Sequence, residues 1–130
     1  MKIYLTRASV AAGDDHDAPH EDTRDLPAGM PLQEVVATVA KSGYLASIAE
    51  QITTSTGTAI VKADATWVLT SAGSAIAVVA QQWNEPLLLT HWDSELASLA
   101  DGDGVVHWHF DYLCQQDPFA VYDELKGRAA

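Results

Sequence analysis

The chain has 130 residues, 48% of them hydrophobic and 19% charged, which is enough apolar material for the core of one ordinary domain. Its 7 Lys and Arg residues against 18 Asp and Glu residues give a formal net charge of −11 at pH 7. Such a balance repels DNA, RNA and anionic lipid, so we expect neither nucleic acid nor a membrane as a partner.

The N-terminal region predicts two strands separated by a loop. Residues Lys2–Arg7 alternate between two sets of side chains, as a strand with one buried face does. Residues 13–22 are polar, acidic and interrupted by a proline, which is typical of a loop. Residues 23–26 are expected to form a short second strand that ends at Pro27.

The clearest helical pattern covers residues 31–42. Pro31 suits the first helical position, where no backbone N–H is needed, and Gly43 follows the last turn. Apolar side chains recur on one stripe of this helix: Leu32, Val35, Val36, Val39 and Ala40. Because β-branched valines lower helix propensity, we expect the helix to lie on a sheet. A second short helix is expected at residues 44–51.

Residues 57–83 have the pattern of a meander of three strands, at 58–62, 66–70 and 75–82. The third strand is apolar on both of its faces. A strand of this kind is typical of the centre of a sheet that is covered on both sides. We therefore expect packed material on each face of the sheet at this strand.

The connection between the last two of these strands contains Ala72 and Gly73. A two-residue turn would force Ala72 to a positive φ, which is costly for a residue with a Cβ, so we expect a three-residue turn with Gly73 left-handed. That register places one set of side chains on one face: Trp67, Leu69, Ala75, Ala77 and Val79. It places the other set on the opposite face: Val68, Ile76 and Val78.

The segment after Pro86 predicts a short helix. Thr90 followed three residues later by Asp93 resembles a capping box. The helix is expected to bury two leucines and to end at a glycine: Leu96, Leu99 and Gly102.

The last part of the chain predicts a strand and a helix. Residues 105–113 alternate strongly, with one set of side chains expected in the core: Val106, Trp108, Phe110 and Tyr112. Asp117 and Pro118 are expected to cap and begin a final helix that ends near Gly127. The helix residues expected to face the core are Phe119, Tyr122 and Leu125.

These elements together predict a single α+β domain over residues 1–130. We expect an antiparallel or mixed sheet of four to six strands, one helix packed on one face and one or two shorter helices. The order of a hairpin, a helix and further strands is similar to β-grasp architecture. That similarity concerns the fold alone and implies no activity.

One set of residues has the composition of a metal site. His107, His109 and Asp111 share one face of the predicted strand, and imidazole with carboxylate suits zinc or iron. His16 and His20 in the acidic loop can complete such a site for a divalent metal. The alternative interpretation is a solvated polar face, which the aromatic alternation on the opposite face explains without any metal. No other cofactor is indicated.

Catalysis finds little support in the sequence. There is no Gly-x-Ser-x-Gly elbow, no P-loop and no Gly-x-Gly-x-x-Gly motif. Cys114 is the single cysteine, so it forms no internal disulfide and is expected to be a buried structural residue. A chain of this kind suits a reducing compartment, and the absence of a signal-like segment favours the cytoplasm. Its alanine-rich, lysine-poor composition is typical of bacteria with GC-rich genomes.

The distribution of charge leads to the principal functional hypothesis. Residues 63–125 contain ten acidic residues and no lysine or arginine. Trp83, Trp92 and Glu85 are the candidate partner-binding residues, because a tryptophan just after a central strand and beside amides can anchor a partner. The alternative interpretation, equally supported by the sequence, is that Trp83 and Trp92 close the edge of the core. We therefore expect a non-enzymatic binding domain of adaptor, inhibitor or immunity type. The alternative is a metal-binding protein or metal-dependent enzyme, and a homodimer through an apolar edge strand is a further possibility.

Overall fold

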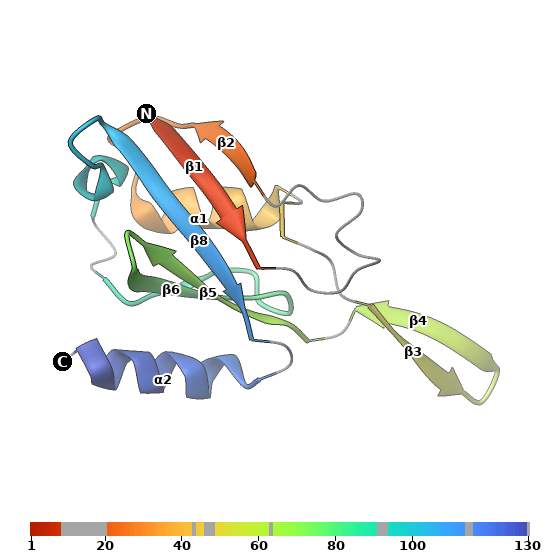
Figure 1. Ribbon diagram of the computed structural model, residues 1–130. Helices are drawn as coiled ribbons and strands as arrows, with labels where there is room; N and C mark the ends of the chain where they lie inside the picture. Colours follow the sequence, from red (N-terminus) through yellow and green to blue (C-terminus); the bar gives the residue numbers. More distant parts are fainter. Residues whose placement is uncertain are drawn as a thin grey trace.

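The computed structural model describes residues 1–8, 21–42, 44–45, 49–62, 64–90, 94–113 and 116–129. A six-stranded mixed sheet in the order β2-β1-β8-β5-β6-β7 forms its centre (Figure 1). The strands are β1 (Lys2–Arg7), β2 (Glu21–Asp25), β5 (Thr66–Ser71), β6 (Ser74–Ala80), β7 (Leu87–Leu88) and β8 (Val105–Tyr112). The pair β1–β8 is parallel and the other pairs are antiparallel. The α+β class and the mixed sheet are thus confirmed.

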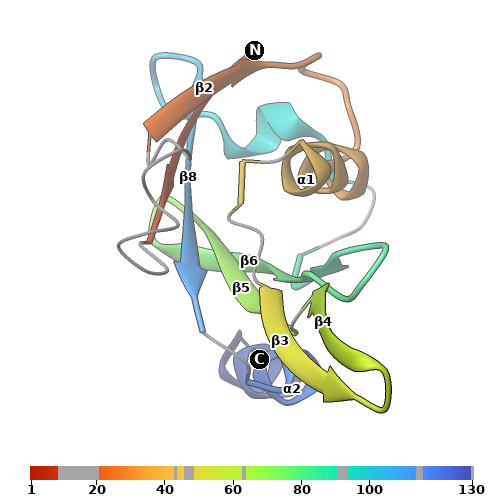
Figure 2. The same ribbon diagram turned by 90° about the vertical axis from the view of Figure 1, so that its right-hand side faces the viewer.

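In the described part of the chain, two α-helices and one 3-10 helix accompany this sheet: α1 (Leu32–Lys41), α2 (Pro118–Ala129) and η1 (Leu96–Leu99). Figure 2 shows α1 on one side of β5 and β6 and α2 on the other side. β6, which corresponds to the strand expected at residues 75–82, is therefore covered on both faces, as its apolar sequence predicts. The three-strand meander is wrong in one respect, because the strand expected at residues 58–62 lies in a separate two-stranded sheet and β5 pairs with β8 instead. No helix among the described ranges is both long and apolar enough to cross a bilayer.

The face under α1 holds the main core. The stripe predicted on this helix is buried, with Leu32, Val35 and Val36 fully inaccessible to solvent. These side chains pack with Trp67, Leu69, Trp108 and Phe110 from the sheet: one cluster joins them all. Burying a valine or leucine completely stabilises a fold by about 1.5–3 kcal/mol. The tertiary packing therefore offsets the low helix propensity of the valines.

The face under α2 is covered more thinly. Its cluster of buried residues is Val68, Val78 and Val121. Tyr122 and Leu125 pack against this cluster and are partly exposed, in line with the sequence prediction. Phe119 is the exception, because 59% of its surface is exposed and it does not face the core. The apolar stripe of α2 is centred on Val121 and Leu125, and Phe119 lies about 140° around the helix from its middle at 100° per residue.

The β5–β6 hairpin corrects the predicted turn. It is a two-residue turn, with Ala72 at φ 49° and Gly73 at φ 87°. The register shifts by one residue between Leu69 and Thr70, which is the signature of a β-bulge. The bulge compensates the short turn, so Leu69 still faces Ala77. It also reverses two predicted orientations, because Ile76 belongs to the α1 side and Ala75 to the α2 side.

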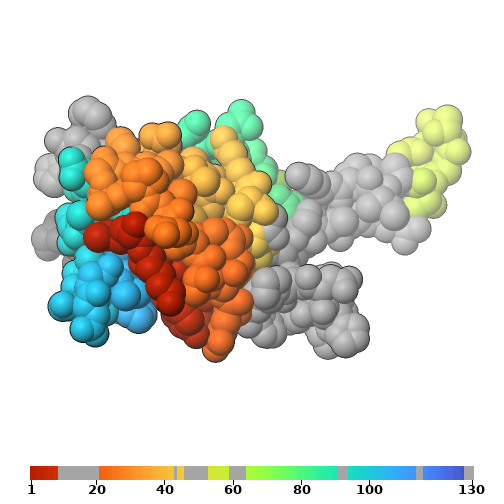
Figure 3. All heavy atoms as spheres, turned by 90° about the horizontal axis from the view of Figure 1, so that it is seen from above, coloured from red at the N-terminus to blue at the C-terminus, as the bar shows by residue number. Residues whose placement is uncertain are grey.

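The helix predicted at residues 44–51 is wrong where the structure describes it. β3 (Ala49–Thr54) pairs antiparallel with β4 (Gly57–Lys62) in a separate two-stranded sheet. The threonines of this segment favour a strand, and Gly57 at φ 135° supports the reversal of the chain. Figures 1 and 3 show this hairpin extending away from the main sheet.

The edges of the six-stranded sheet bear on the expected homodimer. β2 is charged at four of its five positions, and β7 has only two residues. Charged and very short edge strands oppose pairing with a second copy. The homodimer through an apolar edge stays a prediction, for which the β3–β4 hairpin offers the longer uncapped edges among the described elements.

Candidate functional site

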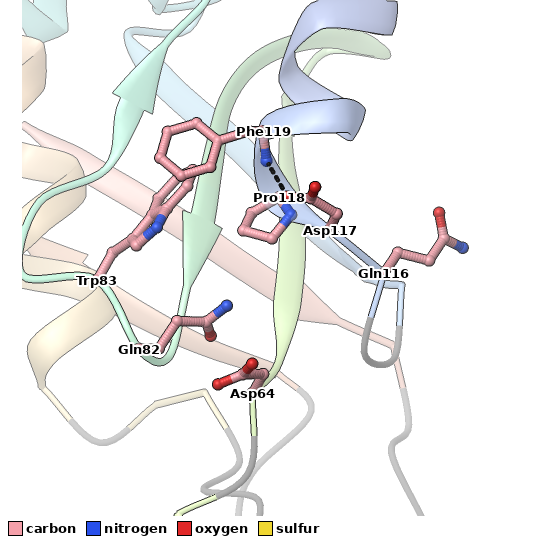
Figure 4. A pocket seen from close by; sticks show the side chains of 7 residues that line it. All are labelled: Asp64, Gln82, Trp83, Gln116, Asp117, Pro118 and Phe119. Atoms are coloured by element: carbon pink, nitrogen blue, oxygen red, sulfur yellow. Dashed lines mark hydrogen bonds between the residues drawn. The ribbon is translucent and has the colours of Figure 1, made fainter.

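A hollow of about 370 Å³ lies where the segment after β6 meets the start of α2. Seven residues line it: Asp64, Gln82, Trp83, Gln116, Asp117, Pro118 and Phe119. Figure 4 shows the two aromatic rings against each other at one end, Gln82 in the middle and Asp64 at the other end. The hollow thus combines an aromatic wall with two carboxylates and lies on the thinly covered side of the sheet.

The aromatic wall is the pair Trp83 and Phe119. Their ring centroids are 4.8 Å apart and the planes are inclined at 53°. Such a tilted contact stabilises by about 0.5–1.5 kcal/mol beyond the burial of area. Phe119 is the one large hydrophobic residue of the described chain that is strongly exposed. An exposed aromatic ring packed against a second ring has the features of a residue that anchors a partner.

Trp83 is held at the wall by the end of β6. Its backbone N–H donates to the carbonyl of Ala80 at 3.0 Å, so the chain turns as soon as the strand ends. The backbone N–H of Gln81 donates to the carbonyl of Ala65 at 2.8 Å, and that of Ala65 donates to Gln82 Oε1 at 3.1 Å. These bonds tie the segment that carries Trp83 to the start of β5.

Phe119 is placed by the cap of α2, as the Asp-Pro pair predicts. Asp117 Oδ1 accepts the backbone N–H of Phe119 at 3.0 Å, and the Asp117 carbonyl accepts that of Val121 at 3.0 Å. Pro118 occupies the first helical position, where it leaves no donor unsatisfied. Thr66 Oγ1 donates to the carbonyl of Gln116 at 2.6 Å and ties the cap to β5. The ring and the carboxylate therefore share one rigid anchor.

The electrostatic character of the hollow is negative. Asp64 and Asp117 line it, and none of the lining residues is basic. The start of α2 contributes about half a positive charge through the helix dipole. Two carboxylates outweigh that contribution and leave a net charge of about −1.5. A cationic group is the ligand that this field attracts.

The predicted partner-binding residues separate in the structure. Trp83 lies in the hollow, as just described. Glu85 does not line it, and instead accepts a hydrogen bond from Gln33 Nε2 at 3.2 Å, next to α1. Trp92 lies outside the described residues. Phe119, Asp64 and Asp117 were not predicted as site residues, although helical periodicity places Phe119 away from the stripe centred on Val121 and Leu125.

The two histidines of the predicted metal site on β8, His107 and His109, contact different aspartates in the structure. His109 Nδ1 lies 2.7 Å from Thr6 Oγ1, while its Nε2 lies 3.0 Å from Asp111 Oδ1. His107 Nε2 lies 3.0 Å from Asp101 Oδ2 instead. Within the described residues no group of three or more His, Cys, Asp or Glu side chains could hold a metal ion.

His16 and His20, the other residues of the predicted metal site, lie outside the described ranges. Cys114, which was predicted to be a buried structural residue, lies outside them as well. The metal hypothesis thus stays a prediction that depends on the acidic loop.

The contact between His107 and Asp101 belongs to a turn in which hydrogen bonds lower the pKa of Asp101. The largest contribution comes from the backbone N–H of Val105, followed by that of Asp103 and then by the His107 imidazole.

The comparisons with known proteins add no relative. Comparison of the chain with family models, with curated proteins and with solved structures found no match. The similarity to β-grasp architecture therefore stays a prediction, and the function has to be argued from the geometry of the site.

Proposed function

We propose that the protein is a binding module that docks on a basic surface of a partner protein through the hollow at Trp83 and Phe119. The exposed Phe119 ring, held between a partly buried tryptophan and a helix cap, is the observation that supports this proposal most strongly. Aromatic residues of this kind are frequent anchors of interfaces, whereas isolated surface charges contribute mainly to the association rate.

The charge of the chain supports the same partner class. The net charge of −11 raises the rate at which a basic surface is met, and the negative hollow orients the encounter. Asp64 and Asp117 give the hollow itself the same sign of charge as the whole chain.

The test uses immobilised basic protein domains, with an acidic domain of similar size as the reference. We expect binding to the basic domains alone, with an association rate that falls as the ionic strength rises. Phe119→Ala should raise the dissociation rate, because the ring supplies the short-range contact. An association rate that does not respond to salt, or a Phe119→Ala variant that binds as the wild type does, would overturn the proposal.

A matched pair of charge variants sharpens the test. The double change Asp64→Asn with Asp117→Asn removes both carboxylates of the hollow, and asparagine still caps a helix well. Glu34→Gln with Asp103→Asn reduces the net negative charge equally at exposed positions, one on α1 and one on the turn before β8, that do not line the hollow. Only the first pair should raise the dissociation rate as well as slow association. Equal effects of both pairs would assign the binding to overall charge and not to this site.

A further inference from the structure

The proposal concerns the chemical group that enters the hollow, and it rests on the proposed function. We infer that the guest is the guanidinium of an arginine side chain of the partner. The starting observation is the combination of an exposed aromatic wall with two carboxylates, those of Asp64 and Asp117, in the lining of a hollow of about 370 Å³. This volume suits a side chain and greatly exceeds what a bare ion requires.

The aromatic pair decides where the guest lies. Ring centroids only 4.8 Å apart leave no space for a group between Trp83 and Phe119. A cation therefore lies on the open face of the wall, where the ring quadrupole attracts it within about 6 Å of a centroid. A guanidinium is planar and stacks on such a face, whereas an ammonium touches it as a point charge.

The acceptors decide between arginine and lysine. Asp117 is fixed beside Phe119 by the helix cap, and Asp64 lies at the opposite end of the hollow, with the Gln82 amide between them (Figure 4). Acceptors distributed in this way match a donor group that is wide and forked. The guanidinium presents five N–H groups in a plane, and the compact ammonium presents three around one atom.

The chain itself contains the same arrangement elsewhere. Arg24 places its guanidinium carbon 5.9 Å from the centroid of the Tyr44 ring, and its Nη1 binds the carboxylate of Asp22. Arginine, aromatic ring and aspartate thus form one unit in this protein. The hollow offers the ring and the aspartates, while none of its lining residues is a lysine or an arginine.

The experiment titrates the full chain with short peptides that differ at one position: arginine, citrulline, lysine or trimethyl-lysine. The indole N–H of Trp83, followed by NMR, reports the position of the guest. Citrulline is the decisive comparison, because it keeps the shape of arginine and loses the charge. We expect the arginine peptide to bind about 5- to 30-fold more tightly than the citrulline peptide, the range of a partly desolvated cation–π contact with charged acceptors.

Variants connect the binding to the hollow. Phe119→Ala and the pair Asp64→Asn with Asp117→Asn should each weaken the binding of the arginine peptide several-fold, while Glu34→Gln with Asp103→Asn should leave it unchanged. Equal binding of citrulline and arginine would overturn the inference. So would a shift of signals away from Trp83, or tighter binding of lysine or trimethyl-lysine.

The two proposals fail in distinguishable ways. If basic domains bind in a Phe119-dependent manner and the arginine peptide does not, the proposed function stands and the arginine assignment is wrong. If neither basic domains nor cationic peptides depend on Phe119, both are wrong.

Discussion

The two faces of the six-stranded sheet bury very different amounts of apolar side chain. Among the residues that the structure describes, a single cluster on the face under α1 contains sixteen buried residues, whereas the cluster under α2 contains three. At about 1.5–3 kcal/mol for each fully buried aliphatic or aromatic side chain, most of the stabilisation comes from the α1 face. The α2 face has correspondingly little of its apolar surface committed to the core.

The difference indicates that the α1 face stabilises the fold, while the α2 face leaves aromatic side chains accessible. Trp83 and Phe119 lie beside the thin cluster, where their rings contribute little to the core and remain accessible to a partner. A site on the α1 face would have to compete with the packing of the helix stripe. The candidate site therefore occurs where the fold can tolerate partly exposed aromatic side chains.

The largest effect is expected from truncating a leucine on the thick face. Leu69→Ala removes a side chain that is completely buried, and we expect a loss of about 2–5 kcal/mol in the free energy of unfolding. Leu125→Ala, on the half-exposed side of α2, should cost about 1 kcal/mol. Urea denaturation of both variants measures the comparison, and equal losses would contradict it.

Alkaline pH is the next way to weaken the α1 face. Burial raises the pKa of Tyr44 to about 12. Between the ordinary value of 10.0 and this value the unfolded chain loses the phenolic proton while the folded chain keeps it, so stability falls as the pH rises. Tyr44→Phe should remove this part of the pH dependence. Stability curves of the two proteins that run parallel through this window would refute the assignment.

A smaller effect is expected at the wall of the hollow. Phe119→Ala breaks the contact with Trp83, yet we expect a loss of stability of only about 1 kcal/mol or less, since the ring is mostly exposed. Binding of a basic domain should fall at the same time. A loss of stability comparable to that of Leu69→Ala would make Phe119 a core residue and remove the contrast between the faces.

The smallest effect is expected at the two-residue turn between β5 and β6. Ala72 has φ 49°, a conformation that asparagine adopts more readily than alanine. Ala72→Asn should therefore stabilise the protein by about 0.5 kcal/mol, as measured by the midpoint of thermal unfolding. A destabilised variant would show that the bulge next to Leu69, and not the turn, sets the register.

Local patterns predicted most of the main sheet because they reflect burial directly. The alternation in β8 and the stripe of α1 each identify a face that must be covered, and both are buried as expected. Residues 49–51 were misassigned to a helix because their place in a strand depends on pairing with β4. The turn at Ala72 was misassigned because local cost favoured a longer loop, whereas the bulge in the hairpin accommodates the short one.

The candidate site was predicted only in part for a similar reason. Trp83 was identified by its place after a central strand, and Asp117 was identified only as a helix cap. Their meeting with Asp64 and Phe119 requires segments that are more than fifty residues apart in the chain to lie together. No local pattern contains that information.

The sequence by itself determined the negative charge, the helix that needs a sheet and the alternating strand, because composition and period reflect solvation residue by residue. Only the tertiary structure decided which aromatic rings stay exposed and which carboxylates accompany them. Those outcomes depend on long-range strand pairing and on the docking of α2, which together determine how completely each face of the sheet is covered.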